Sequence, residues 1–252
     1  MNEEQAKLVA NIEALTPMGI RYVAGIVDSL ASPPEATTRK SWLTSDARWT
    51  EYFGLTISGH HGATVEPLGL VGFEIAFKNA CEAIDWRVDP PGSATQRFVD
   101  TTLETPDGKA RKLSLKSTAA QKLSKSTIHI SKLTEAAWIQ DMRSKRQRRD
   151  RTIQLFREYR GAVDSILMLR AFRENSQSIP HLYQLAEIPS AIFESLEDAP
   201  LDAFASDGPT IDCEYRGHPK AARVSLDRSD SKVTIKQIQL SVCTIHAEWR
   251  LE

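Results

Sequence analysis

The sequence has few of the features that mark secreted, membrane-bound or ATP-driven proteins. Its three cysteines are widely spaced and form no C-x-x-C pair, which argues against a disulfide framework or zinc finger and predicts reduced thiols in the cytoplasm. No run approaches the roughly 18 apolar residues of a membrane-spanning helix. The opening residues, MNEEQAKLVA, lack the basic and apolar regions of a signal peptide. Because no Walker motif occurs, we expect no ATP-driven reaction.

What the sequence does have is an uneven distribution of charge. The net charge is −1, and the hydrophobic share of 41% and charged share of 26% are ordinary for a globular protein. Between residues 109 and 173, however, 17 Lys and Arg stand against 5 Asp and Glu, whereas the rest of the chain has 15 against 28. Such asymmetry predicts a basic surface that meets a polyanion, although a long solvated helix rich in Arg gives the same count.

The organisation of the chain predicts one domain over residues 1–252, because no repeat and no Gly/Ser linker divides it. We expect a mainly helical part over residues 1–90 and a catalytic sheet with a DNA-binding part over residues 91–252. Helical spacing of apolar residues occurs at 8–30, 45–53 and 68–86, with a proline break at 32–38. Strand patterns occur at 96–104, 109–117, 127–130, 163–172 and 181–188, before a β-ribbon over 222–226 and 233–251. These elements predict an α/β or α+β fold around one sheet.

A tight turn joins the first two of these strands. Pro106 suits the second position of a type I turn, Asp107 the next, and Gly108 the left-handed residue that follows. This is typical of a three-residue hairpin loop, in which Thr105 pairs with Lys109. The turn therefore fixes the register of the two strands.

This register brings polar side chains together. Asp100 lies opposite Ser114 and Phe98 opposite Lys116, so Asp100, Ser114 and Lys116 share one face; a two-residue loop would separate them. A carboxylate beside an amine suits phosphodiester hydrolysis, because the carboxylate holds Mg²⁺ and the lysine positions the attacking water. Glu74, on the preceding helix, is the candidate for a second carboxylate. The alternative is a plain exposed salt bridge on an amphipathic strand.

The stretch FVDTTLETPDGKARKLSLKST resembles the Asp…(Asp/Glu/Ser)-x-Lys core of the PD-(D/E)XK nuclease superfamily, which includes most type II restriction endonucleases. Further segments occur in an order similar to SmaI-type restriction endonucleases, over residues 59–249: SGHHG, GFEIAFKNA, LSLKST, IHISKLTE, VDSILMLRAF, YQLAEIP and VCTIHAEW. The resemblance implies a restriction-endonuclease-like mixed sheet flanked by helices. It also implies a homodimer that cuts a palindromic, G/C-rich site in double-stranded DNA with Mg²⁺ as cofactor.

The resemblance also implies roles for individual residues. Asp100 matches the metal-binding aspartate, Lys116 the motif lysine, and the backbone carbonyl of Leu115 a further metal ligand. Ser114 occupies a catalytic position at which the superfamily more often has Glu or Asp, so an acid from another element is needed. The candidates for that acid are, in order, Glu74, Glu135 and Glu104.

Predicted DNA contacts come from three places in the chain. The histidine pair of SGHHG is expected in a loop near DNA; a zinc site would need two further ligands at suitable spacing, and none accompanies the pair. The strand after the hairpin is expected to contact phosphates or bases. The arginines of RSKRQRRDR repel one another in free solution but release counterions on DNA. The predicted DNA-binding residues are His60, His61, Lys125, Ser126, His129, Lys132, Arg143, Arg146, Arg148 and Arg149.

Three functions remain open on the sequence. The first is a type II restriction endonuclease acting as a homodimer, because two-fold symmetry lets two identical sites cut antiparallel strands. The second is a DNA-repair or recombination nuclease with the same chemistry. The third is a non-catalytic DNA-binding protein, which is suggested by Ser114 in place of the acid.

Overall fold

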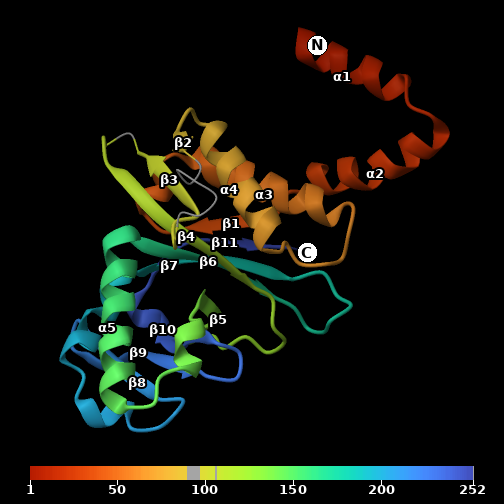
Figure 1. Ribbon diagram of the computed structural model, residues 1–252. Coiled ribbons are helices and arrows are strands. Elements are labelled where there is room, and N and C mark those ends of the chain that lie inside the picture. The colour runs from red at the N-terminus through yellow and green to blue at the C-terminus, as the bar shows by residue number, and fades with distance from the viewer. Residues whose placement is uncertain (90–96, 106, 252) are drawn as a thin grey trace.

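The computed structural model describes residues 1–89, 97–105 and 107–251, and their strands form two sheets (Figure 1). The larger sheet contains β1 (Glu35–Thr38), β2 (Arg87–Asp89), β3 (Thr101–Glu104), β4 (Ala110–Thr118), β6 (Ser165–Phe172), β7 (Leu182–Pro189) and β11 (Thr244–Arg250). The smaller sheet contains β5 (Thr127–Glu135), β8 (Thr210–Tyr215), β9 (His218–Asp227) and β10 (Lys232–Gln239). The expected α+β class is confirmed, whereas the expectation of one sheet is wrong.

The chain divides its last strands between the two sheets. The order in the seven-stranded sheet is β1-β11-β7-β6-β4-β3-β2, with β4 and β6 parallel and the other neighbours antiparallel. The smaller sheet has the order β5-β10-β9-β8. The predicted ribbon near the C-terminus is therefore correct for β9 and β10 but wrong for β11, which pairs with β7 and β1 instead.

Four of the five α-helices in the described ranges begin at a residue whose side chain caps the helix. The α-helices are α1 (Glu3–Glu13), α2 (Pro17–Ala31), α3 (Ala47–His61), α4 (Leu70–Glu82) and α5 (Lys145–Ala162), with the short 3₁₀ helices η1 (Leu43–Ser45), η2 (Ala137–Gln140), η3 (Ser190–Asp198), η4 (Leu201–Phe204) and η5 (Leu240–Val242). Asp46 accepts a backbone hydrogen bond at the start of α3, and Ser144 does so in a capping box on α5. None of the helices in the described ranges is long and apolar enough to cross a membrane.

The first 90 residues contribute to the large sheet as well as to the helices. Pro33 and Pro34 follow the end of α2, and the next residues pair with the last strand, with Glu35 opposite Arg250. At the other edge, Arg87 pairs with Glu104. The expected division at residue 90 into a helical part and a sheet part is therefore incomplete, because both edges of the large sheet come from the first part.

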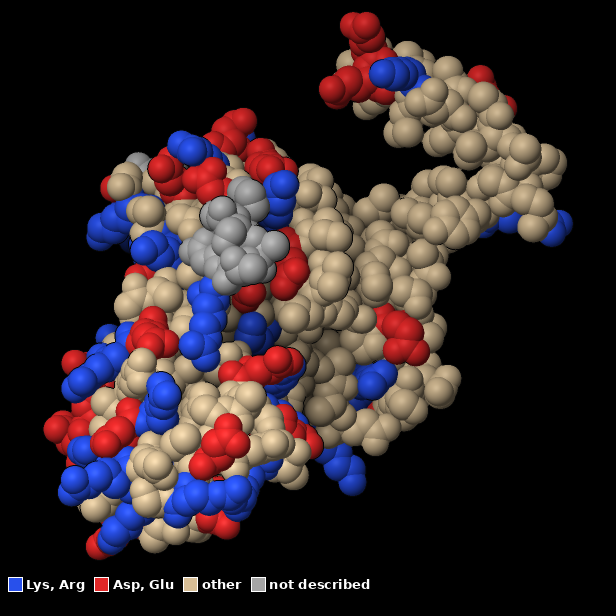
Figure 2. All heavy atoms as spheres, viewed as in Figure 1, with Lys and Arg blue, Asp and Glu red and all other residues tan. Residues whose placement is uncertain are grey.

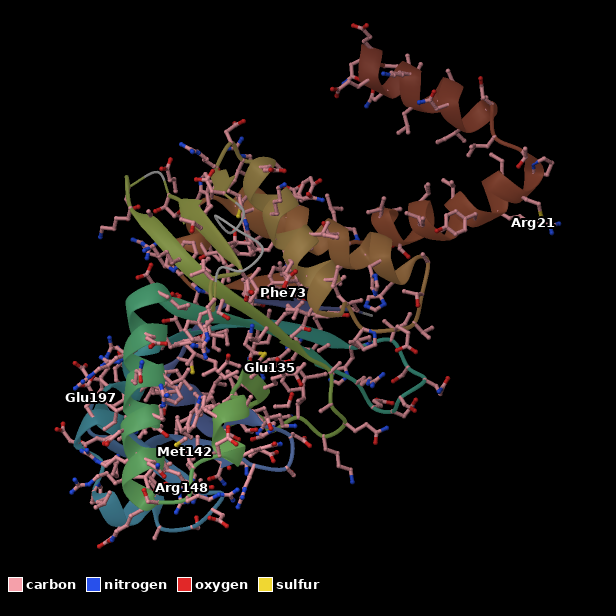
Figure 3. The ribbon with its side chains drawn as sticks, viewed as in Figure 1. Arg21, Phe73, Glu135, Met142, Arg148 and Glu197 are labelled. Atoms are coloured by element: carbon pink, nitrogen blue, oxygen red, sulfur yellow. The ribbon has the colours of Figure 1, made fainter. Side chains whose placement is uncertain are left out.

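The seven-stranded sheet has an apolar core on each face. Leu167 of β6 packs in the cluster formed with α3 and α4, to which Phe73 also belongs (Figure 3), whereas Met168 packs in the cluster formed with α5 and the smaller sheet. On β4, Leu113 and Leu115 belong to the α3–α4 cluster. Because side chains alternate along a strand, Ser114 of β4 faces the side of α5. Ser114 and Lys116, which share this face of β4, thus lie on the side of the large sheet that packs against α5 and the smaller sheet.

Candidate active site where strands β3 and β4 separate

The turn after β3 has the predicted register. Thr101 pairs with Leu113, the backbone N–H of Thr105 donates to the carbonyl of Lys109 at 3.1 Å, and Gly108 has a φ of +74°. Pro106 lies outside the described residues. The pairing predicted from the turn residues is therefore confirmed, and Asp100 reaches the face of β4 that carries the predicted site.

The first strand is shorter than predicted. The segment expected to start at residue 96, which lies outside the described residues, becomes a strand only at Thr101. Phe98 has a φ of +76°, so the chain turns away before it can pair with Lys116, and the predicted pair is wrong. The Phe98 ring instead packs at 5.1 Å, between centroids, from that of Tyr159. Strands β3 and β4 therefore separate at Asp100.

The Asp100 carboxylate fills the space that this separation opens. Its Oδ2 accepts hydrogen bonds from the backbone N–H of Leu115 at 2.6 Å, from Ser114 Oγ at 3.1 Å and from Lys116 Nζ at 3.2 Å. Three donors on one oxygen hold the carboxylate in a fixed orientation. Among the described residues, the hydrogen bonds to Asp100 all reach Oδ2.

Lys116 bridges two oxygen atoms of the site. Besides the contact with Asp100, its Nζ donates to the backbone carbonyl of Leu115 at 2.9 Å. The Lys116 and Asp100 side chains are 18% and 31% exposed, so the pair is shielded but still reachable from solvent. The structure thus brings together Asp100 and Lys116, which the predicted register placed on one face, and the Leu115 carbonyl. Their catalytic and metal-binding roles stay predictions.

Glu74 is the candidate acid that shares a cavity with Asp100. The two carboxylates, together with Leu115, line a cavity of about 180 Å³ between α4 and the strands. Burial raises the pKa of Glu74, and the negative charge of Asp100 raises it further, while Lys116 acts in the opposite direction. Glu74 therefore lies within electrostatic reach of the other two site residues.

The other two candidate acids have different partners. Glu135 ends β5 in the smaller sheet, where it pairs with Lys132 at 2.6 Å (Figure 3). Glu104 pairs with Arg87 at 3.7 Å, at the far end of β3. Of the three candidate acids, Glu74 is the one that lines a cavity with Asp100, and its role as the missing acid stays a prediction.

The donor set of the site suits magnesium. Asp100 and Glu74 offer carboxylate oxygens and Leu115 a carbonyl oxygen, which are the ligand types that Mg²⁺ prefers. In the described ranges, no three or more His, Cys, Asp or Glu side chains form a metal-binding group. A set of two carboxylates nevertheless fits Mg²⁺, because this ion keeps several of its waters when it binds to proteins.

Tyr159 is a site neighbour that the sequence did not reveal. Its hydroxyl is buried and has no well-aligned hydrogen-bond partner, and the polar side chain it meets is that of Ser114. Burial raises the pKa of Tyr159; the Ser114 hydroxyl opposes this rise, and the charge of Asp100 adds to it. Helical spacing puts Tyr159 on the buried face of α5, but it does not tell which strand that face covers.

A second, larger cavity opens beside Lys116. It has a volume of about 500 Å³ between β4 and β5, and its lining includes Ser117, His129 and Lys132. Burial lowers the pKa of His129, and the nearby charges of Lys236 and Lys232 lower it further. Lys125 and Ser126 are exposed in the turn that leads into β5. Of the predicted DNA-binding residues in this segment, His129 and Lys132 therefore share a cavity with Lys116.

The histidine pair lies in a helix and not in the expected loop. His60 and His61 form the last turn of α3, and His60 Nε2 lies 2.7 Å from the carbonyl oxygen of Glu66. His61 lies 3.0 Å from the Thr64 carbonyl oxygen and 2.9 Å from the Tyr183 hydroxyl. These contacts connect the end of α3 to the following loop and to β7. The loop placement was therefore wrong, and a role in DNA contact stays a prediction.

The basic segment is largely neutralised within the fold. Arg148 is only 4% exposed, donates to the carbonyls of Phe204 and Ala205, and pairs with Asp207 (Figure 3). Arg149 donates to two backbone carbonyls near the end of η3. The predicted phosphate contacts do not fit Arg148 and Arg149, because their guanidinium groups serve internal bonds.

Two arginines of this segment remain at the surface. Arg143 and Arg146 are exposed, and no ion pair involves either side chain in the part of the chain that the structure describes. Figure 2 shows basic and acidic side chains interleaved over α5 and the smaller sheet. A continuous basic face is therefore not present in this view, and the contact of Arg143 and Arg146 with DNA stays a prediction.

Comparison with known proteins gives one distant relative. The chain is 26% identical over 208 residues to the type II restriction enzyme SmaI of Serratia marcescens, covering 79% of this chain and 78% of that enzyme. No protein-family model matches the chain. No solved structure matches it either. The similarity supports a distant relationship to a restriction endonuclease.

Proposed function

We propose that the protein is a Mg²⁺-dependent type II restriction endonuclease, which cuts double-stranded DNA as a homodimer at a short, palindromic, G/C-rich site. The observation that carries this proposal is the meeting of Asp100, Lys116 and the Leu115 carbonyl where β3 and β4 separate, with Glu74 in the same cavity. The distant similarity to a type II restriction enzyme supports the same reading. A PD-(D/E)XK active site is the interpretation that joins these two observations.

Each residue of the site has a defined chemical task in this proposal. Asp100 and Glu74 would hold Mg²⁺ together with the Leu115 carbonyl, and the bound ion supplies charge neutralisation at the phosphate and a more acidic water. Lys116 would position the attacking water and interact with the negative charge that develops on the phosphate. Ser114 keeps Asp100 oriented through its hydrogen bond to Oδ2.

The cavity between β4 and β5 is the proposed path of the DNA backbone. Lys116, His129 and Lys132 are among its lining residues, so a phosphate group placed there meets two lysine side chains. Lys132 already pairs with Glu135 at 2.6 Å, and DNA would compete with that exposed carboxylate. Phosphate contacts of this kind position DNA without reading its sequence.

Digestion of a supercoiled plasmid with Mg²⁺ tests the proposed function. We expect a small set of discrete fragments from the wild type, and at least about 100-fold slower cleavage by Asp100→Ala and Lys116→Ala, because each removes a group that acts on the reacting phosphate. Lys112→Ala is the matched control, since this lysine lies on the same strand but is outside the site. It should cleave at the wild-type rate.

The same digest separates the alternatives. Cleavage that depends on ends, nicks or flaps would indicate a repair or recombination nuclease. Intact plasmid in Mg²⁺ and in Mn²⁺, despite clear DNA binding, would indicate a non-catalytic DNA-binding protein, which Ser114 in the acid position would then explain. Near wild-type cleavage by Asp100→Ala or Lys116→Ala would contradict the proposed site.

A further inference from the structure

The loop that joins β4 to β5 connects the two walls of the cavity beside Lys116. This β4–β5 loop comprises residues 119–126, and its Ala120 lines the cavity. Gln121 and Lys122 follow at once, and both side chains are exposed. Among the described residues, no hydrogen bond or ion pair involves either of these two side chains. The loop therefore presents two polar groups that the fold itself does not use.

The beginning of the β4–β5 loop is fixed to a second loop. Strands β4 and β6 are parallel and end at Thr118 and Phe172, so the loops that follow them leave the large sheet on the same side (Figure 1). Arg173 Nε donates to the carbonyl of Ala119 at 3.2 Å, and its Nη1 donates to the carbonyl of Ser176 at 3.2 Å. One guanidinium group thus connects the β4–β5 loop to the loop between β6 and β7.

The end of the β4–β5 loop is held by a buried arginine of β6. Arg170 is 1% exposed, and its Nη2 donates to the carbonyls of Ser124 and, at 3.3 Å, of Thr127. Its Nη1 donates to the side-chain carbonyl of Gln184. Burial of a guanidinium group is costly unless its donors are bonded, so these bonds hold the arginine and the loop carbonyls in one arrangement. Both ends of the loop are therefore tied to other elements of the sheet.

Lys122 has an uncommon backbone conformation. Its φ is +58°, in the left-handed region that glycine adopts without strain and that lysine rarely occupies. Residues held in such conformations cluster at binding sites, where the surrounding structure maintains them. The fold would be served as well by glycine at this position, so the lysine is explained by a task of its side chain.

The two exposed side chains lie within reach of the bases next to the candidate site. Lys116 and Lys122 are six residues apart, so at about 3.3 Å per residue their Cα atoms are separated by at most about 20 Å. Successive base pairs are about 3.4 Å apart, so this distance spans about six base pairs. Lysine donates to the guanine edge in the major groove, and glutamine pairs with the adenine edge. Both residue types are therefore suited to read a short site.

We propose that Gln121 and Lys122 read base edges in the major groove, while the cavity with Lys116 and Lys132 holds the DNA backbone. Hydrogen bonds to base edges are directional and need donors in a fixed position, which the two arginine contacts of the loop provide. A phosphate contact needs no such support, because lysine meets it as a flexible point charge. The inference rests on the proposed function, because base reading is needed only where a sequence is recognised.

Selection from a pool of DNA duplexes with a randomised core tests this inference. Ca²⁺ replaces Mg²⁺ because it binds to oxygen ligands of the same kind, and the bound duplexes are sequenced. The wild type should enrich one motif. In Gln121→Ala and in Lys122→Gly, the preference for the best base at one or more positions should fall at least about fivefold. Affinity for the unselected pool should stay within about threefold of wild type, because phosphate contacts supply non-specific binding.

Lys122→Gly also separates reading from folding. Because glycine adopts the left-handed conformation without strain, the thermal midpoint of this variant should equal or exceed that of the wild type. A lower midpoint would contradict the strained conformation on which the inference relies.

Lys132→Ala and Lys40→Ala are the controls. Lys132 lines the cavity, so its variant should keep the motif but bind every sequence more weakly, with a salt dependence whose slope is smaller by about one. Lys40 is exposed between β1 and η1, and its variant should match the wild type in motif and affinity. A wild type that enriches no motif, a motif unchanged in either loop variant, or a motif lost in either control would overturn the inference. Cleavage is not measured here, so a motif lost in both loop variants supports base reading even if the plasmid stays intact.

Discussion

At the residue scale, Ser114 explains how the site differs from the motif it resembles. The side chain is 2% exposed, and its hydroxyl donates to the same oxygen of Asp100 that Leu115 and Lys116 contact. A hydroxyl can also accept a hydrogen bond, and the buried hydroxyl of Tyr159 lies next to it. Ser114 therefore lies between the buried Tyr159 of α5 and the partly exposed carboxylate of Asp100.

We predict that Tyr159→Phe raises the Mg²⁺ concentration needed for half-maximal cleavage by about 10-fold, because residues behind a metal ligand typically tune its affinity by this order. The thermal midpoint should change little, since the substitution keeps the buried aromatic ring of Tyr159. A Mg²⁺ titration of cleavage and a melting curve provide the two readouts. Ser114→Ala should shift the Mg²⁺ dependence in the same direction, and an unchanged Mg²⁺ dependence in both variants would refute this role.

At the element scale, the hairpin of β3 and β4 was predictable because its register depends on three consecutive turn residues. The point where the strands separate was not, because Phe98 adopts a left-handed backbone conformation that its residue type does not indicate. The position of the histidine pair was missed for another reason: α3 continues past Gly59 and ends only at His61, with Gly62 as its C-cap residue. Local turn chemistry thus predicted the register, whereas the ends of elements depended on tertiary contacts.

A buried polar contact ties three further elements together. Trp42 Nε1 donates to Glu187 Oε2 at 2.9 Å, and His246 Nε2 lies 3.0 Å from the same oxygen, so η1, β7 and β11 meet at one carboxylate. Burial acts to raise the pKa of Glu187, but its interactions with His246 and two further side chains outweigh burial and leave the pKa below its usual value. The ionised form of Glu187 therefore stabilises the fold.

This shift has a definite sign in the dependence of stability on pH. A lowered pKa in the folded state contributes stability that is present above the unfolded pKa of about 4.3 and is lost as the pH falls through the folded value. Glu187→Gln should lower the free energy of unfolding by about 1–3 kcal/mol at pH 7. Urea denaturation at pH 7 and near pH 3 should show the difference from wild type shrinking in acid. An equal difference at both pH values would contradict the assignment.

At the scale of the whole molecule, several basic residues counted along the sequence are paired with acidic residues of other elements. Acidic residues that follow β7 return to the basic helix: Asp202 pairs with Lys145, and Glu197 pairs with Arg157 and Arg160 (Figure 3). Because these partners lie far apart in the sequence, a count of charged residues over one segment does not reveal that the charges are paired. The distribution of strands over two sheets was hidden for the same reason, because β11 crosses from the neighbourhood of β10 to pair with β7.

Long-range contacts of the same kind distinguish the three candidate acids. Three candidates were compatible with the sequence, and the fold brings Glu74 of α4 into the cavity of Asp100 while Glu104 and Glu135 pair with other cations. The proposed metal-dependent cleavage therefore depends on Glu74, which precedes the hairpin in sequence and comes close to it only in the folded chain.

Plasmid cleavage by three glutamate variants tests the proposed role of Glu74. With Mg²⁺ at saturation for the wild type, Glu74→Gln should cut at least about 100-fold more slowly, because it removes a metal-binding carboxylate. Glu104→Gln and Glu135→Gln are matched controls and should cut within about twofold of the wild-type rate, because exposed ion pairs contribute little. Wild-type cleavage by Glu74→Gln, or a loss confined to either control, would contradict the account.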